Sequence, residues 1–166
     1  GHTAEMIRLL QGVDLDRYNQ RLYIVGETDL LSLDQIGSLE AKRDHTAEEY
    51  MVSRIPRSRE VGQSWSSSVF SSLRCLFSVC QAVFQHSPDA VLCNGPGNCV
   101  LVCAAALIPR FLGIKWISII YVESFARVRS LSLSGKLVYL MADRFVVQWP
   151  SLLEKYPSAE FIPHLV

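Results

Sequence analysis

The sequence has no excess of charge of either sign. Its 166 residues include sixteen Lys and Arg and sixteen Asp and Glu residues, so its formal net charge at neutral pH is zero. A protein that binds nucleic acid through the phosphate backbone carries a basic excess or a basic patch. The balanced composition therefore argues against a general nucleic-acid-binding protein and predicts no nucleic-acid partner.

Long apolar runs are also missing, although 49% of the residues are hydrophobic. The longest uninterrupted run, Cys99 to Pro109, is shorter than the about 18–20 residues that a membrane-spanning helix needs. The length fits one domain with a substantial core, which we assign to residues 1–166. The chain opens on Gly1 and not on an initiator Met, so we expect an upstream segment, whose content this sequence does not give.

Cysteine is present, but not at the spacing of a metal site. Cys93, Cys99 and Cys103 are separated by five and three residues, so they lack the short Cys-x2-Cys clip. We therefore predict no metal site. The apolar neighbours of the five cysteines favour reduced core residues of an intracellular protein.

Motifs that bind a nucleotide cofactor or activate a serine are absent as well. The sequence contains no Walker loop, no G-x-S-x-G and no G-x-G-x-x-G, so we predict no bound cofactor. One alternative stays open, because dinucleotide-binding domains carry an acidic residue about 20 residues beyond their glycine loop. Glu27 stands near that distance from Gly1, which keeps an oxidoreductase cofactor domain as a minor possibility.

Short apolar segments alternate with segments of helical periodicity. In residues 65–86, apolar side chains recur at the spacing of an amphipathic helix. Residues 115–122 form the continuous apolar run that is typical of a central parallel strand. This alternation predicts an α/β fold, a Rossmann-like parallel sheet with helices on both faces. The predicted strands are 21–26, 50–55, 89–94, 115–122, 144–149 and 159–163, and the predicted helices are 4–11, 65–86, 98–111, 134–142 and a turn after Pro150.

Two further segments complete this prediction. The stretch 27–49 is rich in Asp and Glu, so we interpret it as a solvated variable loop. The tripeptide Gly1-His2-Thr3 stands directly before an amphipathic helix, as the end of a glycine loop does. Because such loops follow a strand, we expect a strand immediately before Gly1, at the centre of the sheet.

Three loops are predicted to meet at one edge of the sheet, because open parallel sheets bind ligands beyond the carboxyl ends of their strands. They are Gly1-His2-Thr3, the loop from Asn94 to Asn98, and Glu123-Ser124. The glycines of the second loop allow close backbone approach, and free N–H groups at a helix start can bind an oxyanion such as phosphate. A plain strand-to-helix turn is the alternative for this loop.

Two side chains in these loops are candidates for acid–base chemistry. His2 would lie at the mouth of the cleft and titrate near neutrality, or it is a polar helix neighbour without a role. Glu123 ends an apolar strand, where a carboxylate must face a cleft or pair with a cation. Arg127 and Arg129 follow, and they either form that ion pair or meet a diphosphate.

Several long motifs resemble one family. They are GHTAEM, IPRSREVGQS, CNGPGNCV, LGIKWISIIYVES, ARVRSLSLSGKLVY, ADRFVVQWP and KYPSAEF. In this order they closely resemble the membrane-anchoring subunit of the eukaryotic UDP-N-acetylglucosamine transferase of asparagine-linked glycosylation. The resemblance covers nearly the whole chain and is weakest over 27–49.

The resemblance implies a split enzyme. This chain would be the N-terminal, acceptor-side half of a two-domain GT-B glycosyltransferase, and a soluble catalytic subunit would supply the half that binds most of UDP-N-acetylglucosamine. The pair would add the second N-acetylglucosamine to N-acetylglucosaminyl-diphospho-dolichol, so the chain is part of an enzyme, while activity of this chain alone is left open. The implied location is the cytosolic face of the endoplasmic reticulum membrane, with the nuclear membrane as a second site. The family's membrane helix and first strand are not in this sequence.

The same resemblance assigns roles to residues. The Gly1-His2-Thr3 loop would face the acceptor diphosphate and the attacking hydroxyl, and the second loop would line the acceptor. Either His2 or Glu123 would be the base, with Glu123 preferred because it ends a rigid strand. The tail would dock the catalytic subunit. The second-loop residues are Asn94, Gly95, Pro96 and Gly97, the diphosphate ligand is Arg127, and the tail is His164, Leu165 and Val166.

One rival function comes from the same family. The chain could be a purely structural tether that recruits its partner to the membrane and holds no catalytic group. Substitutions in the cleft would then leave activity intact, whereas deletion of residues 164–166 would abolish it.

Overall fold

The fold was analysed in a computed structural model, which describes residues 2–18, 20–41, 50–56, 65–95 and 97–163. Six strands are present in these ranges, and every pairing between them is parallel. They form a two-stranded sheet of order β1-β2 and a four-stranded sheet of order β3-β4-β5-β6. The strands are β1 (Arg21–Gly26), β2 (Tyr50–Ile55), β3 (Ala90–Cys93), β4 (Ser118–Val122), β5 (Arg144–Val147) and β6 (Glu160–Phe161).

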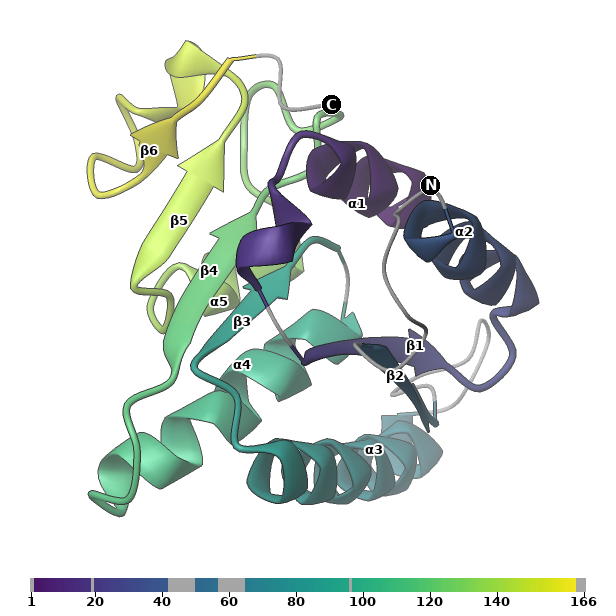
Figure 1. Cartoon of the computed structure of the whole chain (residues 1–166). Coiled ribbons are helices and arrows are strands. Elements are labelled where there is room, and N and C mark those ends of the chain that lie inside the picture. Colours follow the sequence, from purple (N-terminus) through teal and green to yellow (C-terminus); the bar gives the residue numbers. More distant parts are fainter. Residues whose placement is uncertain (1, 19, 42–49, 57–64, 96, 164–166) are drawn as a thin grey trace.

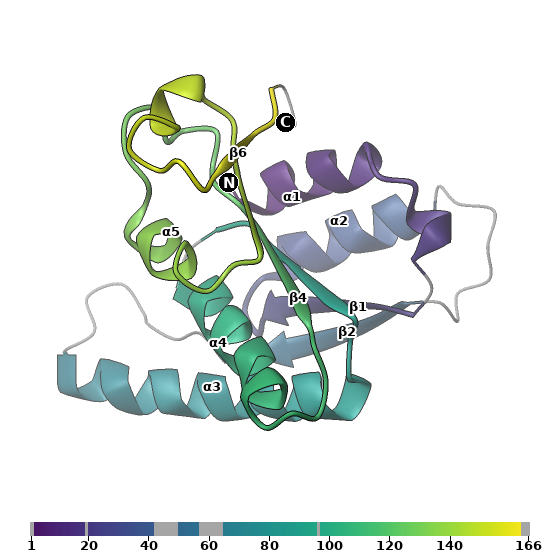
Figure 2. The same ribbon diagram turned by 90° about the vertical axis from the view of Figure 1, so that its left-hand side faces the viewer.

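Helices cover both faces of the sheets (Figure 2). Helices α1 and α2 lie side by side on one face, and α3, α4 and α5 lie on the other (Figures 1 and 2). This arrangement confirms the predicted α/β, Rossmann-like architecture. The helices are α1 (His2–Gln11), α2 (Leu30–Glu40), α3 (Trp65–His86), α4 (Gly97–Phe111) and α5 (Leu133–Val138), with short 3-10 turns at Leu15–Arg17 and Pro150–Leu152.

The main core lies between the four-stranded sheet and the layer of α3 and α4. Ile119 and Tyr121 of β4 are fully buried there. Ala105 and Ala106 of α4 are also fully buried, and these small side chains let the helix approach the sheet closely. Val122 of β4 is buried in a separate cluster, and burial on both faces explains the apolar run at the end of this strand. The strand begins at Ser118 and not at 115 as predicted, and Trp116 before it is exposed.

The prediction of a solvated loop over 27–49 is wrong for residues 30–40, which form α2. Asp29 caps this helix, because its side chain accepts a hydrogen bond from the backbone N–H of Ser32 at 3.1 Å. Ile36 and Leu39 are buried, and Leu39 packs with residues of α1. Asp34 of this helix is exposed, whereas Glu40 at its end is buried. Residues 42–49 lie outside the described residues.

Two smaller predictions also differ from the structure. The helix predicted over 134–142 is α5, which ends at Val138, and the turn after Pro150 is a single 3-10 turn. Gly113 follows the end of α4, and its φ of 67° is a left-handed conformation that favours glycine. The strand expected before Gly1 stays a prediction.

A buried polar cluster joins β1 to the end of α2. Arg21 donates two hydrogen bonds to the carboxylate of Glu40, at 3.0 and 2.9 Å, and Tyr23 donates a third. Burial of Glu40 favours its neutral form, but the hydrogen bonds from Arg21 and Tyr23 and the charge of Arg21 outweigh it. The pKa of Glu40 is therefore lowered below its ordinary value.

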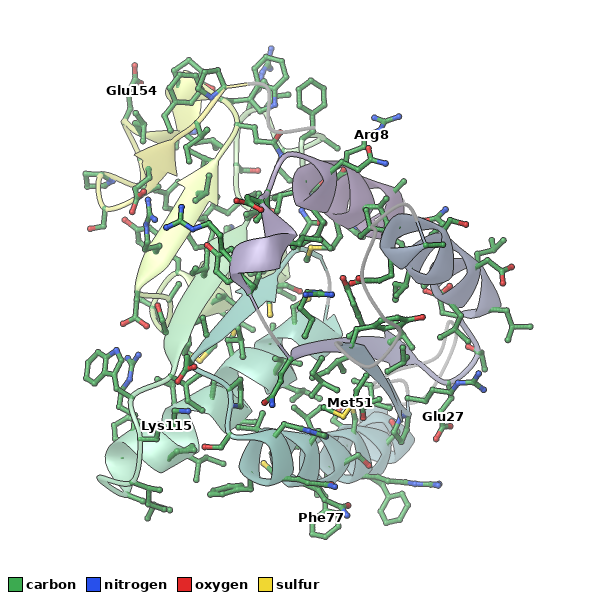
Figure 3. All side chains as sticks on the ribbon, viewed as in Figure 1. Arg8, Glu27, Met51, Phe77, Lys115 and Glu154 are labelled. Carbon is green, nitrogen blue, oxygen red and sulfur yellow. The ribbon has the colours of Figure 1, made fainter. Side chains whose placement is uncertain are left out.

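Helix α3 presents large apolar side chains to its outer side. Val69, Phe70, Leu73 and Phe77 are all exposed, and Figure 3 shows Phe77 pointing away from the body of the molecule. These residues belong to the periodic pattern that predicted the helix, while Cys75, Val79 and Val83 form the buried side. Within the described ranges, no helix combines the length and the apolar character needed to cross a membrane.

Candidate functional site

The three predicted loops do meet at the carboxyl edge of the four-stranded sheet. Asn94, which follows β3, donates a hydrogen bond from Nδ2 to the carbonyl oxygen of Val122 at the end of β4, at 3.1 Å. The same amide group donates to Glu5 of α1 at 3.2 Å. The start of α1, the loop after β3 and the end of β4 therefore form one connected site, as the sequence predicts.

His2 lies against Gly95 at this edge. A Cβ atom built on Gly95 would stand 3.1 Å from Cγ and 3.2 Å from Cβ of His2. Gly95 also has a φ of 128°, which side chains rarely tolerate. Its carbonyl oxygen accepts a hydrogen bond from the Tyr121 hydroxyl at 2.9 Å. The backbone thus favours glycine at 95, and a larger residue would crowd the side chain of His2, which is itself exposed.

Glu123 is placed differently from the expectation. Its side chain is only 2% exposed, and its carboxylate accepts three hydrogen bonds, from the backbone N–H of Ser124 at 2.9 Å and from both the N–H and the hydroxyl of Ser132 at 3.0 Å. The predicted ion pair with Arg127 or Arg129 is absent among the described residues. Three neutral donors stabilise the buried carboxylate in place of a cation.

The hydrogen bonds of Glu123 fix the loop that leads into α5. Ser132 caps α5, because its hydroxyl accepts from the backbone N–H of Gly135 at 2.9 Å. The same hydroxyl donates to Glu123. Glu123 therefore ties the end of β4 to the start of α5, and its carboxylate points into this packing and not into an open cleft.

Arg127 lies in the exposed part of that loop. Its backbone N–H donates to the carbonyl oxygen of Ser124 at 3.0 Å. The loop is held from the other side by Trp149, whose indole N–H donates to the carbonyl oxygen of Phe125 at 2.7 Å, with the two rings 5.0 Å apart. The guanidinium is thus carried by an anchored loop beside the candidate site.

Thr3 faces α2. Its hydroxyl oxygen lies 2.8 Å from that of Ser32, and the Ser32 hydroxyl donates to the capping carboxylate of Asp29. This hydrogen-bond chain uses the side chain of Thr3 to join α1 to α2. Any contact that Thr3 makes with a phosphate would therefore come from its backbone.

Sequence reasoning missed two polar residues of the site. Glu5 accepts hydrogen bonds from Asn94 and from the hydroxyl of Ser124, and Gln148 donates to the carbonyl oxygen of Glu123 at 3.1 Å. Glu5 looks in the sequence like an ordinary acidic residue of a first helical turn, which complements the helix dipole. Gln148 stands at the end of the apolar segment that predicted β5, and nothing in that segment marks it as a residue of the site.

The cysteines around the second loop pack together. Cys93, Cys99 and Cys103 all pack in the main apolar core. Interaction with Cys93 lowers the pKa of Cys99, against the opposing effect of burial, and the backbone N–H of Asn94 lowers it further. All five cysteines of the chain are free thiols, and no group of three His, Cys, Asp or Glu side chains in the described ranges is arranged to hold a metal ion.

Several predicted site residues lie outside the described residues. They are Gly1, Pro96, His164, Leu165 and Val166.

The fold is similar to that of a solved protein structure. The crystal structure of MurG from Acinetobacter baumannii superposes on 98% of this chain with a TM-score of 0.64 and 15% sequence identity. The chain spans 41% of the MurG chain, so the likeness concerns the fold of one part of that protein. It supports a Rossmann-like half of a GT-B fold.

Sequence relatives match over the whole length. The UDP-N-acetylglucosamine transferase subunit ALG14 of Rattus norvegicus is 48% identical over 171 residues, which cover 100% of this chain and 79% of the relative. The proteins of the same name from Homo sapiens and Yarrowia lipolytica are 45% and 44% identical, over 100% and 97% of this chain and 79% and 74% of their own lengths. The family described as "Oligosaccharide biosynthesis protein Alg14 like" matches residues 1–165. The chain belongs to this family of oligosaccharide biosynthesis proteins.

Proposed function

We propose that this chain is the acceptor-side subunit of a UDP-N-acetylglucosamine transferase that adds the second N-acetylglucosamine to N-acetylglucosaminyl-diphospho-dolichol. The observation that carries the proposal is its similarity, over its whole length, to proteins named as subunits of that transferase. The likeness to one part of MurG supports a chain that supplies only half of a GT-B fold. The chain is therefore not an enzyme by itself.

The partner in this proposal is a soluble catalytic subunit that supplies the other half and holds UDP-N-acetylglucosamine. The C-terminal residues His164, Leu165 and Val166 dock that subunit, since an uncharged, largely apolar tail suits a buried contact. The pair works on the cytosolic face of the endoplasmic reticulum membrane. The exposed apolar side of α3, with Phe70 and Phe77, is compatible with work at a lipid surface.

In the proposed reaction, His2 is the base. It takes the proton from the 4-hydroxyl of the acceptor sugar, the hydroxyl oxygen bonds to C1 of the donor sugar, and the bond from C1 to UDP breaks with its electron pair leaving on UDP. His2 is preferred to Glu123 because its imidazole is exposed at the site, whereas the carboxylate of Glu123 is buried and hydrogen-bonded. Glu123 then acts as a positioning residue.

The acceptor diphosphate lies at the start of α4 in this proposal. Gly95 and Gly97 allow close approach to backbone N–H groups there, and the positive end of the helix dipole favours an anion. Arg127 adds a positive charge from the anchored loop beyond Ser124. No resident metal or cofactor takes part in the proposal.

A two-component transfer assay tests the proposed function. This chain, a candidate soluble catalytic subunit, and the two together are incubated with labelled UDP-N-acetylglucosamine and an N-acetylglucosaminyl-diphospho-lipid. We expect the two-sugar lipid only when both chains are present. Full transfer by the soluble subunit alone would contradict the proposal, as would no transfer by a complex that co-purifies.

A further inference from the structure

Among the described residues, the side-chain hydrogen bonds that join α1 to the ends of two central strands are made by Glu5. It belongs to the first turn of α1, and its carboxylate accepts a hydrogen bond from the Ser124 hydroxyl at 2.9 Å through Oε1 and from Asn94 Nδ2 at 3.2 Å through Oε2. Each oxygen therefore binds a different loop, 119 and 89 residues away in the sequence.

The two partners of Glu5 are themselves fixed. Asn94 is 7% exposed and donates a second hydrogen bond to the carbonyl oxygen of Val122. Ser124 is 6% exposed, and its hydroxyl also accepts from the backbone N–H of Ala126 at 3.3 Å. Because neither partner moves freely, the carboxylate sets the position of the start of α1 relative to the sheet edge.

His2 stands one helical turn before Glu5, and residues three apart lie on the same side of a helix. The imidazole of His2 in turn contacts Gly95, the residue that follows Asn94. His2 and Glu5 thus contact two consecutive residues of the loop after β3. A rotation of the first turn of α1 would change both together.

We propose that Glu5 is a positioning residue that holds the imidazole of His2 against the loop after β3, at the distance that proton transfer from the acceptor requires. This inference rests on the proposed function, in which His2 is the base. Glu5 is suited to the task because its two carboxylate oxygens can accept from two loops at once, and Asp at this position would be one methylene too short to keep both hydrogen bonds.

The test compares Glu5→Gln with Glu5→Ala in the two-chain enzyme. Gln keeps both links, since its carbonyl oxygen accepts from Asn94 and its amide N–H donates to the hydroxyl oxygen of Ser124. We expect Glu5→Gln to retain near-wild-type kcat. Glu5→Ala frees the first turn of α1, and since a misplacement of 1 Å can cost about 100-fold in rate, we expect kcat to fall about 10- to 100-fold with an unchanged KM for UDP-N-acetylglucosamine.

A double-mutant cycle shows whether Glu5 acts through His2. In a His2→Ala background, Glu5→Ala is expected to cause no further loss of kcat, because the positioned group is already gone. A loss that multiplies with that of His2→Ala would overturn the inference. An equal loss in Glu5→Gln and Glu5→Ala would also overturn it, because the negative charge of Glu5 and not its hydrogen bonds would then be what the reaction needs.

A second readout does not depend on transferase activity. The imidazole NMR signals of His2, assigned with His2→Ala, are expected to shift in Glu5→Ala and to stay in place in Glu5→Gln. If Glu5→Ala fails to fold, Ser124→Ala removes one of the two hydrogen bonds and is expected to cause a smaller shift of the same signals. Unchanged His2 signals in a folded Glu5→Ala chain would overturn the inference. Absence of transfer by the wild-type pair would instead refute the proposed function. The His2 NMR signals would still test whether Glu5 positions the imidazole.

Discussion

Glu123 and Gly135 lie so close that a Cβ atom on residue 135 would stand 2.1 Å from Oε2 of Glu123. The carboxylate cannot retreat easily, because three hydrogen bonds from Ser124 and Ser132 hold it. Gly135 is therefore required by the packing of a buried carboxylate against the start of α5.

Gly135→Ala is predicted to destabilise the chain. Inserting one methyl group into a packed region costs about 1–3 kcal/mol, and the loss appears as a lower midpoint in urea unfolding. Gly37→Ala is the matched control, since Gly37 is also helical and a Cβ atom there meets nothing within 4 Å. We expect that control to be neutral or stabilising, because Ala favours a helix over Gly. Equal midpoints for the two variants would contradict the packing.

Glu123→Gln tests whether Glu123 holds the loop before α5 in place or acts as the general base of the transfer. Both carboxylate oxygens accept hydrogen bonds from donors, so the amide N–H of Gln would face a donor, and we expect a loss of about 1–3 kcal/mol in unfolding free energy. Turnover per folded two-chain enzyme is expected to fall less than about tenfold. Loss of a general base costs about 10²–10⁴-fold, and a fall of that size would make Glu123 the base.

Gly95→Ala is predicted to impair turnover through His2. The new Cβ atom would crowd the imidazole at 3.1 Å, and the φ of 128° adds strain of about 1–3 kcal/mol. Gly113→Ala controls for strain alone, because Gly113 has a φ of 67° and open space around it. We expect both variants to lose stability and only Gly95→Ala to lose kcat in the two-chain assay. If both retain the wild-type kcat, the contact with His2 has no catalytic consequence.

The hydrogen-bonded pair of Arg21 and Glu40 predicts how the free energy of unfolding depends on pH. Since the pKa of Glu40 is lowered in the folded chain, its stabilising effect is fully present above its ordinary pKa of about 4.3. It is lost as the pH falls from that value through the lowered one. Glu40→Ala is expected to cost about 1.5–3 kcal/mol at neutral pH, because it removes the hydrogen bonds that Arg21 and Tyr23 donate to the carboxylate.

Urea unfolding between pH 3 and pH 7 measures this effect. The wild-type chain is expected to lose more stability on acidification than Glu40→Ala does. Glu154→Gln, which changes an exposed carboxyl, is expected to follow the wild type throughout. Parallel curves for wild type and Glu40→Ala would contradict the assignment.

Periodicity predicted the bounds of several elements, although in α3 the apolar pattern also includes exposed residues. The bounds of β1, β2 and α3 agree with the predicted ones, since their apolar positions recur at the spacing of the element. The composition of 27–49 does not reveal α2, because most charged residues of that stretch flank the helix, which itself contains only Asp34 and Glu40. Asp29 before Leu30 is nevertheless a capping signal.

The connections within the site could be predicted only in part. The convergence of His2, Asn94 and Glu123 follows from parallel strands, because all their carboxyl ends share one edge. The partners of each side chain do not follow from this rule. Glu123 finds its donors in Ser124 and Ser132 only because the loop after β4 turns back on itself, and no spacing in the sequence encodes that turn.

The central claim is that this chain takes part in the transfer and does not only tether its partner. The most direct measurement is kcat of the two-chain enzyme carrying His2→Ala, compared with Arg8→Ala. Arg8 belongs to the same helix and points away from the sheets (Figure 3). We predict that both variants co-purify with the soluble subunit, that His2→Ala lowers kcat by about 10²–10⁴-fold and that Arg8→Ala does not. A His2→Ala enzyme with wild-type kcat would contradict the account and favour a purely structural subunit.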